Sequence, residues 1–217
     1  MSAPTITAQR CRVVALLSGS GSNLQALIDT QASSSYEIVA VISNKQDAFG
    51  LRRAAKHGIA TETLSHRDFA SRESFDSKLA KLVDSFKPDL VVLAGFMRIL
   101  TAPFVALFAG RLVNIHPSLL PEFPGMNTHQ RALDAGVSEH GASVHFVTEE
   151  LDGGPVIARR KVSVTADDTA ESLAAKVLTE EHKLYPEVVE WFARGELSLT
   201  AGQALHSRLG LPVDLEA

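Results

Sequence analysis

Cysteine is almost absent from this sequence, since Cys11 is the single thiol among 217 residues. One thiol cannot form a disulfide within the chain, so a reducing, cytoplasmic environment is expected. No apolar run approaches the ~18 residues that a membrane-spanning helix needs, which predicts no membrane partner. Residues 1–10 also lack the charged start and apolar core of a signal peptide. We interpret them as a short flexible tail ahead of a single domain, residues 11–217.

A basic surface is missing too. The 21 Lys and Arg residues face 25 Asp and Glu residues, a formal net charge of −4, and no basic block occurs. This balance argues against a nucleic-acid partner but allows a small anion at one site. Apolar residues make up 45% and charged residues 21%, as in ordinary globular domains, so disordered and fibrous classes are excluded.

Signatures of metal and serine chemistry are also absent. The 8 His residues show no HExxH spacing and the lone Cys allows no CxxC pair, so no metal site is predicted. Four of the His residues are interpreted as surface residues, namely His57, His66, His140 and His182. A Gly-x-Ser-x-Gly elbow does not occur, which argues against a serine hydrolase.

What the sequence does contain is an alternation of strand-like and helix-like segments. Runs rich in Val, Ile and Leu that are almost wholly apolar are typical of strands covered on both faces. The alternation predicts an open, mostly parallel, twisted α/β sheet with helices on both faces. Strands are predicted at residues 12–17, 37–43, 59–64, 89–96, 111–115, 142–147 and 155–164, and helices near 22–32, 49–57, 67–86 and 126–135.

A last long helix is predicted after residue 168. Asp168 suits its N-cap, with Glu171 at the third helical position as the reciprocal partner. Glu181 lies on the apolar face, where a carboxylate is costly unless it is paired or bound to a polar group. Two interpretations stay open. Glu181 either lies at the edge of the core, where its carboxylate reaches solvent or pairs with a nearby Arg, or it binds a polar ligand. The apolar face is formed by Leu173, Val177, Leu184, Val188 and Phe192.

The segment "SGSGSN", residues 18–23, follows the first predicted strand and opens the first helix. Gly19 and Gly21 allow a tight turn, and the free N–H groups of a helix start can hold a phosphate. A dinucleotide fingerprint is disfavoured, because Leu24 occupies the third glycine position and no acidic residue ends the second strand. A monophosphate cradle and a plain tight turn both stay open.

Two polar side chains end the strand at 111–115. Asn114 and His116 lie two residues apart, so they point to the same side of a strand whose carboxyl end faces any ligand. An amide N–H beside an imidazolium suits a developing oxyanion. Prolines at 117, 121 and 124 restrict the loop that follows. A histidine satisfied by a backbone carbonyl is the alternative.

Asp152 precedes two glycines and a proline in the turn "LDGGP". Turn aspartates usually hydrogen-bond their own backbone. A carboxylate near His116 would instead favour the imidazolium and could accept a proton through water.

Taken together, these blocks resemble the folate-dependent formyltransferases, and within them the members that formylate glycinamide ribonucleotide. The resemblance covers roughly residues 12–192 and implies a Rossmann-like single domain. It rests on "ALLSGSGSNLQALID", "VISNKQDAFGL", "VVLAGFMRIL", "GRLVNIHPSLLPEFPG", "GASVHFVTEELDGGPVI" and "EHKLYP".

The resemblance implies a set of roles. Gly21, Ser22 and Asn23 would hold the 5′-phosphate of the ribonucleotide, and Glu181 its ribose hydroxyls. The catalytic trio would be Asn114, His116 and Asp152, and the Leu120–Pro121 peptide would be cis. The contacts to 10-formyltetrahydrofolate would come from Arg72, Met97, Arg98, Ile99, Leu100, Asn114, Thr148, Glu149, Glu150, Leu151 and Asp152.

The implied reaction moves a formyl group from 10-formyltetrahydrofolate to the glycyl amine of glycinamide ribonucleotide in purine biosynthesis, without metal. A homodimer is compatible with the sequence. Formylation of methionyl-tRNA or hydrolysis of the formyl donor is the nearest alternative, but those enzymes carry a further domain for which this chain has no room. A regulatory module with an inactive site and a dinucleotide oxidoreductase are more distant alternatives.

Overall fold

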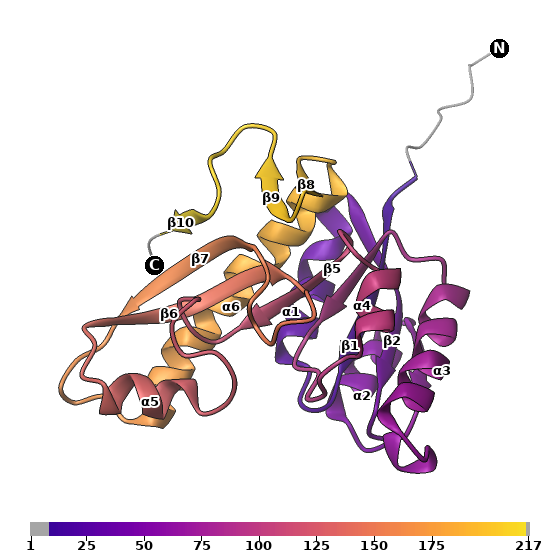
Figure 1. Cartoon of the computed structure of the whole chain (residues 1–217), viewed down its shortest axis with the longest axis horizontal. Coiled ribbons are helices and arrows are strands. Elements are labelled where there is room, and N and C mark those ends of the chain that lie inside the picture. The colour runs from indigo at the N-terminus through magenta and orange to yellow at the C-terminus, as the bar shows by residue number, and fades with distance from the viewer. Residues whose placement is uncertain (1–8, 216–217) are drawn as a thin grey trace.

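A mixed sheet crosses the molecule, with helices on either side of it (Figure 1). In the computed structural model, which describes residues 9–215, the strand order is β10-β7-β6-β5-β4-β1-β2-β3. The strands of this sheet are β1 (Cys11–Leu17), β2 (Tyr36–Ser43), β3 (Ala60–Thr63), β4 (Leu90–Leu93), β5 (Leu112–His116), β6 (Glu139–Phe146), β7 (Val156–Ser163) and β10 (Val213–Leu215). The helices are α1 (Ser22–Thr30), α2 (Phe49–Lys56), α3 (Arg72–Ser85), α4 (Ala102–Leu107), α5 (Thr128–Asp134) and α6 (Ala170–Ala193), with short 3-10 turns at Gln31–Ser33 and His66–Asp68.

Strand β6 runs against its neighbours. It pairs antiparallel with β5 and with β7, whereas β1 pairs in parallel with β2 and β4, β2 with β3, β4 with β5, and β7 with β10. The predicted mostly parallel sheet is therefore confirmed. The reversal at β6 matters for the site, because it sets residues of β6 directly opposite the polar end of β5.

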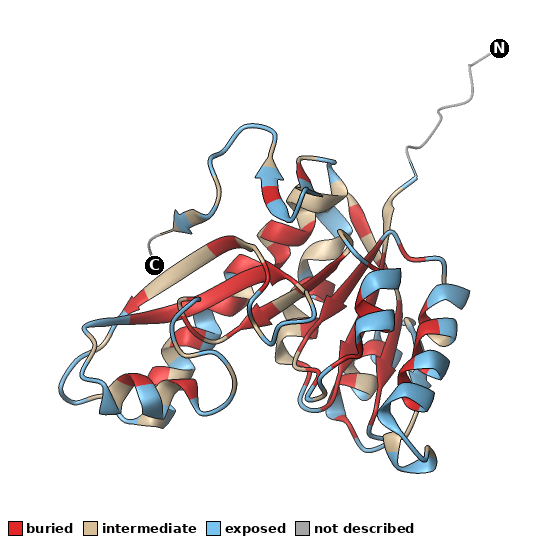
Figure 2. Cartoon of the chain, viewed as in Figure 1, coloured by how far each residue is buried: buried red, intermediate tan, exposed pale blue. Residues whose placement is uncertain are grey.

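Strand β1 shows why its sequence is almost wholly apolar. Val13, Ala15 and Leu17 join a core shared with α1 and α6, while Val14 and Leu16 join a second core shared with α3 and α4. Each fully buried Val or Leu side chain contributes about 1.5–3 kcal/mol relative to an exposed one. Figure 2 shows the central strands buried along their length and the helices exposed on their outer sides. Helices cover both faces, as predicted.

Two helices begin later than the sequence suggested. Helix α3 starts at Arg72 rather than near residue 67, because Ser71 forms a capping box there. Helix α5 starts at Thr128 rather than 126, because Asn127 has a φ of 57° and so leaves the helical region. The predicted strand 89–96 ends at Leu93, after which the chain turns toward α4.

The start of α6 also differs by one residue from the prediction. Thr169, rather than Asp168 with Glu171, caps the helix, and Thr169 and Ser172 exchange side-chain and backbone hydrogen bonds. Asp168 binds the Lys176 ammonium at 2.6 Å instead. The apolar face of α6 is confirmed, since Leu173, Val177, Leu184 and Val188 are fully buried and Phe192 is partly buried.

Helix α4 and the strands after residue 192 were not predicted. Strands β8 (Leu197–Thr200) and β9 (Gln203–His206) form a separate hairpin, and β10 then adds an edge strand beside β7. All are short, and their alternation of apolar and polar residues is too brief to predict a strand. The proposed tail at residues 1–10 falls almost entirely outside the described residues.

Candidate active site

The end of β5 positions two polar side chains on one side of the sheet. Val113 and Ile115 are buried in the core shared with α6, and the alternation places Asn114 and His116 on the opposite face of β5, which also carries buried Leu112. Asn114 is partly buried and His116 is 6% exposed. The two side chains therefore lie on one side of the strand, as the sequence pattern predicted, and His116 is shielded from bulk water.

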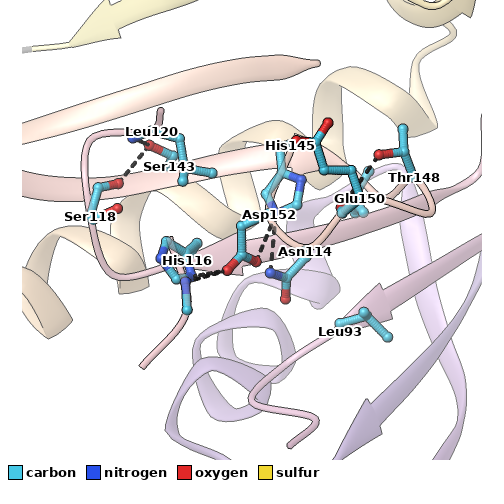
Figure 3. A network of polar contacts seen from close by, with 12 residues as sticks. Leu93, Asn114, His116, Ser118, Leu120, Ser143, His145, Thr148, Glu150 and Asp152 are labelled. Atoms are coloured by element: carbon cyan, nitrogen blue, oxygen red, sulfur yellow. Dashed lines mark hydrogen bonds and ion pairs between the residues drawn. The ribbon is translucent and has the colours of Figure 1, made fainter. Parts of the chain in front are cut away.

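Asp152 reaches this pair from the loop between β6 and β7 (Figure 3). Its Oδ2 lies 3.4 Å from Nδ1 of His116, and its side chain is 9% exposed. The same oxygen accepts a hydrogen bond from the Gly125 N–H at 2.8 Å. Asp152 has a positive φ of 52°, yet its side chain bonds to another loop rather than to its own turn. The structure therefore brings the expected trio of Asn114, His116 and Asp152 together.

The second nitrogen of His116 also has a partner. Its Nε2 lies 3.0 Å from the carbonyl oxygen of Phe123. The sequence left open whether His116 would simply bond to a backbone carbonyl. The structure shows that contact together with the contact to Asp152. Both ring nitrogens face acceptors, and only a ring protonated on both nitrogens can donate to both.

His145 was missed by the sequence analysis. It lies directly opposite Asn114 in the β5–β6 pairing, and its Nε2 is 3.1 Å from Asn114 Nδ2 (Figure 3). Its Nδ1 lies 2.9 Å from the carbonyl oxygen of Phe146 and so carries the proton. Burial lowers the pKa of His145, so the neutral ring accepts from the Asn114 amide through Nε2. This fixes the amide orientation and leaves the second Nδ2 hydrogen of Asn114 unused by His145.

The loop after β5 is fastened from β6. The Ser143 hydroxyl donates to the Ser118 carbonyl at 2.6 Å and accepts from the Leu120 N–H at 2.9 Å. The Leu120–Pro121 peptide is cis, as the resemblance implied. Because Ser143 lies opposite His116 in the pairing, the strand that carries His145 also fixes the loop beside His116.

The predicted phosphate cradle lies at the start of α1. Gly21 has a φ of 69°, and a Cβ at this position would lie 2.6 Å from the Cα of Gly50, so both the turn and the close approach require glycine. Helix α1 has no side-chain cap, which leaves the N–H groups of its first turn unpaired by side chains. Residues 21–23 therefore have the geometry of an anion site.

Glu181 lies beside this cradle. It is 6% exposed, and its Oε2 accepts a hydrogen bond from Asn23 Nδ2 at 2.7 Å. Burial raises the pKa of Glu181, and the hydrogen bond from Asn23 opposes that shift. The carboxylate is paired with an amide rather than reaching solvent or an Arg. Residues proposed for phosphate and ribose therefore meet although they come from α1 and α6.

Most residues expected to contact the folate line one cleft beside Asn114. The cleft includes Arg98, Ile99 and Leu100, His145, and the loop with Thr148, Glu149, Glu150, Leu151 and Asp152. Arg72 and Met97 are not among the residues that line it. Arg72 is the exposed first residue of α3, and Met97 is 63% exposed.

One predicted surface histidine is buried instead. His140 is 1% exposed, because it lies on β6 and packs edge-on against Phe123 and His129. Burial lowers the pKa of His140 to about 4. Across residues 9–215 no group of three or more His, Cys, Asp or Glu side chains could hold a metal ion. No helix in the same range is long and apolar enough to cross a membrane.

Comparison with known proteins gives consistent matches. Residues 11–189 match the family described as formyl transferase. Phosphoribosylglycinamide formyltransferase of Escherichia coli (strain K12) is 56% identical over 189 residues, which cover 86% of this chain and 89% of that protein. The trifunctional purine biosynthetic protein adenosine-3 of Bos taurus is 45% identical over 197 residues, which cover 90% of this chain and 20% of that protein. The solved structure of Coxiella burnetii phosphoribosylglycinamide formyltransferase in complex with CHES has a TM-score of 0.88 at 49% identity, covering 91% of this chain and 93% of that one.

Proposed function

Because this chain belongs to the formyl transferase family, we propose that it transfers a formyl group from 10-formyltetrahydrofolate to the glycyl amine of glycinamide ribonucleotide. The products are formylglycinamide ribonucleotide and tetrahydrofolate, and the reaction is a step of purine biosynthesis. Two of the relatives named above are phosphoribosylglycinamide formyltransferases by name and the third is a purine biosynthetic protein by name, which supports the choice of substrate and pathway.

The arrangement of Asn114, His116 and Asp152 carries this proposal. Attack of an amine on a formyl carbon produces a tetrahedral intermediate with an oxyanion, which hydrogen-bond donors held in place stabilise. His145 already accepts one Nδ2 hydrogen of Asn114, so the other is available to the oxyanion. His116 supplies the second donor, and Asp152 holds its ring through Nδ1.

His116 can donate to the oxyanion only if its Nε2 exchanges the Phe123 carbonyl for the formyl oxygen. Phe123 belongs to the loop between β5 and α5, so we expect this loop to shift when the substrates bind. Asp152 retains Nδ1 during the exchange, which keeps the ring oriented. In the absence of substrate, the Phe123 carbonyl therefore accepts the hydrogen bond from His116 Nε2 that the formyl oxygen accepts during the reaction.

Proton transfer completes the reaction. The glycyl nitrogen forms a bond to the formyl carbon and must lose a proton, which Asp152 accepts through a water molecule. Collapse of the intermediate then breaks the bond between the formyl carbon and N10 of the folate, and Asp152 returns the proton through water to N10. The protein groups in these steps are Asn114, His116 and Asp152, and no metal is required by this scheme.

The two substrates have separate binding regions. The N–H groups at residues 21–23 suit the 5′-phosphate, and Glu181 suits the ribose hydroxyls. The cleft formed by residues 98–100 and 148–152 suits the folate, because its backbone groups at 98–100 have no hydrogen-bond partners among the described residues. All of these residues come from one chain, so a homodimer is not needed to complete the site. We place the enzyme in the cytoplasm, in keeping with its single cysteine.

The direct test is to incubate the purified protein with 10-formyltetrahydrofolate and glycinamide ribonucleotide and to follow the formylated product by mass spectrometry. We expect turnover with glycinamide ribonucleotide and none with methionyl-tRNA. His116→Ala should reduce turnover by roughly 10³-fold, as loss of an oxyanion donor does elsewhere. Absence of product, or faster formylation of methionyl-tRNA, would overturn the proposal.

A further inference from the structure

The segment that leads from β4 to α4, residues 97–101, has backbone groups available to a ligand. Arg98, Ile99 and Leu100 line the cleft beside Asn114. Within residues 9–215 none of the backbone N–H or C=O groups of residues 98–100 makes a hydrogen bond. Unpaired peptide groups beside a cleft can recognise a heterocycle with donors and acceptors along its edge, provided that the segment is held still.

The first end of this segment is fixed from β1. The Met97 N–H donates to the Ser18 hydroxyl oxygen at 2.8 Å, and that hydroxyl donates to Asn44 Oδ1 at 2.6 Å. Ser18 is 3% exposed and Asn44 is 4% exposed. Met97 is thus connected through Ser18 to the residues that directly follow β1 and β2.

The other end is fixed from α3. The Asp76 side chain, which is 2% exposed, accepts the Thr101 N–H at 2.6 Å through Oδ2. Next to Asp76, the ring of Phe75 lies under the Arg98 guanidinium, 5.0 Å from the ring centre. Helix α3 therefore holds the segment by one charge-assisted hydrogen bond and one cation–π contact.

Stability alone does not account for Asp76. Its second oxygen, Oδ1, is buried and has no hydrogen-bond partner in the described part of the chain. A buried carboxylate with a single partner costs free energy relative to an apolar residue of similar size. What the carboxylate provides is a fixed position for Thr101, where the segment joins α4.

We propose that Asp76 and Ser18 are positioning residues that hold residues 97–101 in the conformation required to bind the folate. This inference rests on the proposed function, because it needs the folate to occupy the cleft of residues 98–100. A segment held at both ends does not have to be ordered at the moment of binding, which lowers the cost of association. Neither residue touches the ribonucleotide region or the trio around His116.

The test is Asp76→Leu, which removes the acceptor and keeps a side chain that branches at Cγ. We expect the KM for 10-formyltetrahydrofolate and the Kd for tetrahydrofolate to rise roughly 10-fold, the scale of one hydrogen bond to a charged group. The KM for glycinamide ribonucleotide should stay within about 2-fold, and kcat within about 3-fold, because the loss concerns binding of one substrate.

Three further variants separate positioning from folding. Asp76→Asn keeps an oxygen that can accept the Thr101 N–H, so its folate KM should lie much closer to that of the unmodified protein. Ser18→Ala should reproduce the selective rise in folate KM, and it keeps the proposal testable if Asp76→Leu does not fold. Tyr36→Phe is the matched control: it removes a buried hydroxyl, bonded to the Leu27 carbonyl at 2.9 Å, away from the segment, and should leave both KM values unchanged.

The outcomes are distinct. If the unmodified protein neither binds tetrahydrofolate nor forms product, the proposed function fails, whatever the variants do. If it does both, but folded Asp76→Leu and Ser18→Ala keep the folate KM of the unmodified protein, the positioning role is wrong. A fall in Tm with equal changes in both KM values would likewise overturn it, since that result describes a structural carboxylate.

Discussion

Replacing Asp152 by Asn isolates the effect of its negative charge. The Asp152 carboxylate lies 3.4 Å from Nδ1 of His116, and the two side chains are 9% and 7% exposed. At an effective dielectric constant of about 20, opposite unit charges at that distance attract by about 5 kcal/mol. Burial of the two charges offsets part of this attraction. If about half of it acts on the charge of His116 in the transition state, turnover falls roughly 10²-fold, because each ~1.4 kcal/mol is a factor of ten.

The expected result is specific to kcat. The amide introduced by Asp152→Asn is isosteric with the carboxylate, so its oxygen can still accept the Gly125 N–H and preserve the loop contact. Initial rates measured over a grid of both substrates should show kcat lower by roughly 10² or more and both KM values changed by less than about 3-fold.

A matched control tests whether loss of any partly buried carboxylate lowers turnover. Glu190 accepts the Ser35 N–H at 2.7 Å from the far end of α6, and its side chain is 16% exposed. Glu190→Gln should keep full turnover even if it lowers Tm. Near-normal turnover in folded Asp152→Asn would refute the reasoning, because the aspartate would then only shape its turn.

Three other results are expected. Glu181→Gln should raise the ribonucleotide KM roughly 10-fold. Burial raises the pKa of Glu181, so the free energy of unfolding should fall as the pH rises from the pKa of the unfolded state through that of the folded state. The neutral Gln variant should therefore have an equal or higher Tm at neutral pH. A lower Tm with unchanged KM would contradict this. Gly154→Ala should lower the free energy of unfolding by about 3 kcal/mol in urea titrations, because its Cβ would overlap the Phe146 carbonyl oxygen, whereas Gly19→Ala, with no atom within 4 Å, should change it little. Inorganic phosphate should inhibit in competition with the ribonucleotide through the start of α1, and competition with the folate instead would exclude residues 21–23 as its site.

The predictable part of the site is the part that lies in continuous motifs. Asn114 and His116 could be found because side chains alternate along a strand, and the helix start at residues 21–23 because glycines permit its turn. Glu181 could be found because a charge on an apolar helix face needs a partner. The expected roles of these residues in binding and catalysis remain predictions.

Contacts that depend on strand register could not be found in the same way. His145 acts on Asn114 only because β6 runs antiparallel to β5 and sets the two residues opposite each other. The expected alternation of strands and helices indicated a parallel sheet, in which that pairing does not occur. The Phe123 carbonyl that occupies His116 comes from an irregular loop, and no periodicity predicts its path.

Asp76 could be predicted from the sequence in part: its burial could, but its hydrogen-bond partner could not. It stands within α3, next to buried Phe75 and one turn from buried Leu79 and Ala80, so a helical projection would have marked it as a buried acid. Its partner, the Thr101 backbone, could not be identified from sequence, because the segment before α4 has no regular structure and α4 itself was not predicted.

The bond between Asn23 and Glu181 joins residues 158 positions apart in the chain. A ribonucleotide held by both would act as a removable crosslink between the first helix and the last. Binding to the folded state alone stabilises it in proportion to the logarithm of free ligand concentration. The protection should be concentrated where α1 meets α6, so that amide exchange at these distant segments slows together when the substrate is present. In a cell, the supply of its own substrate would then help to set how long the folded chain survives.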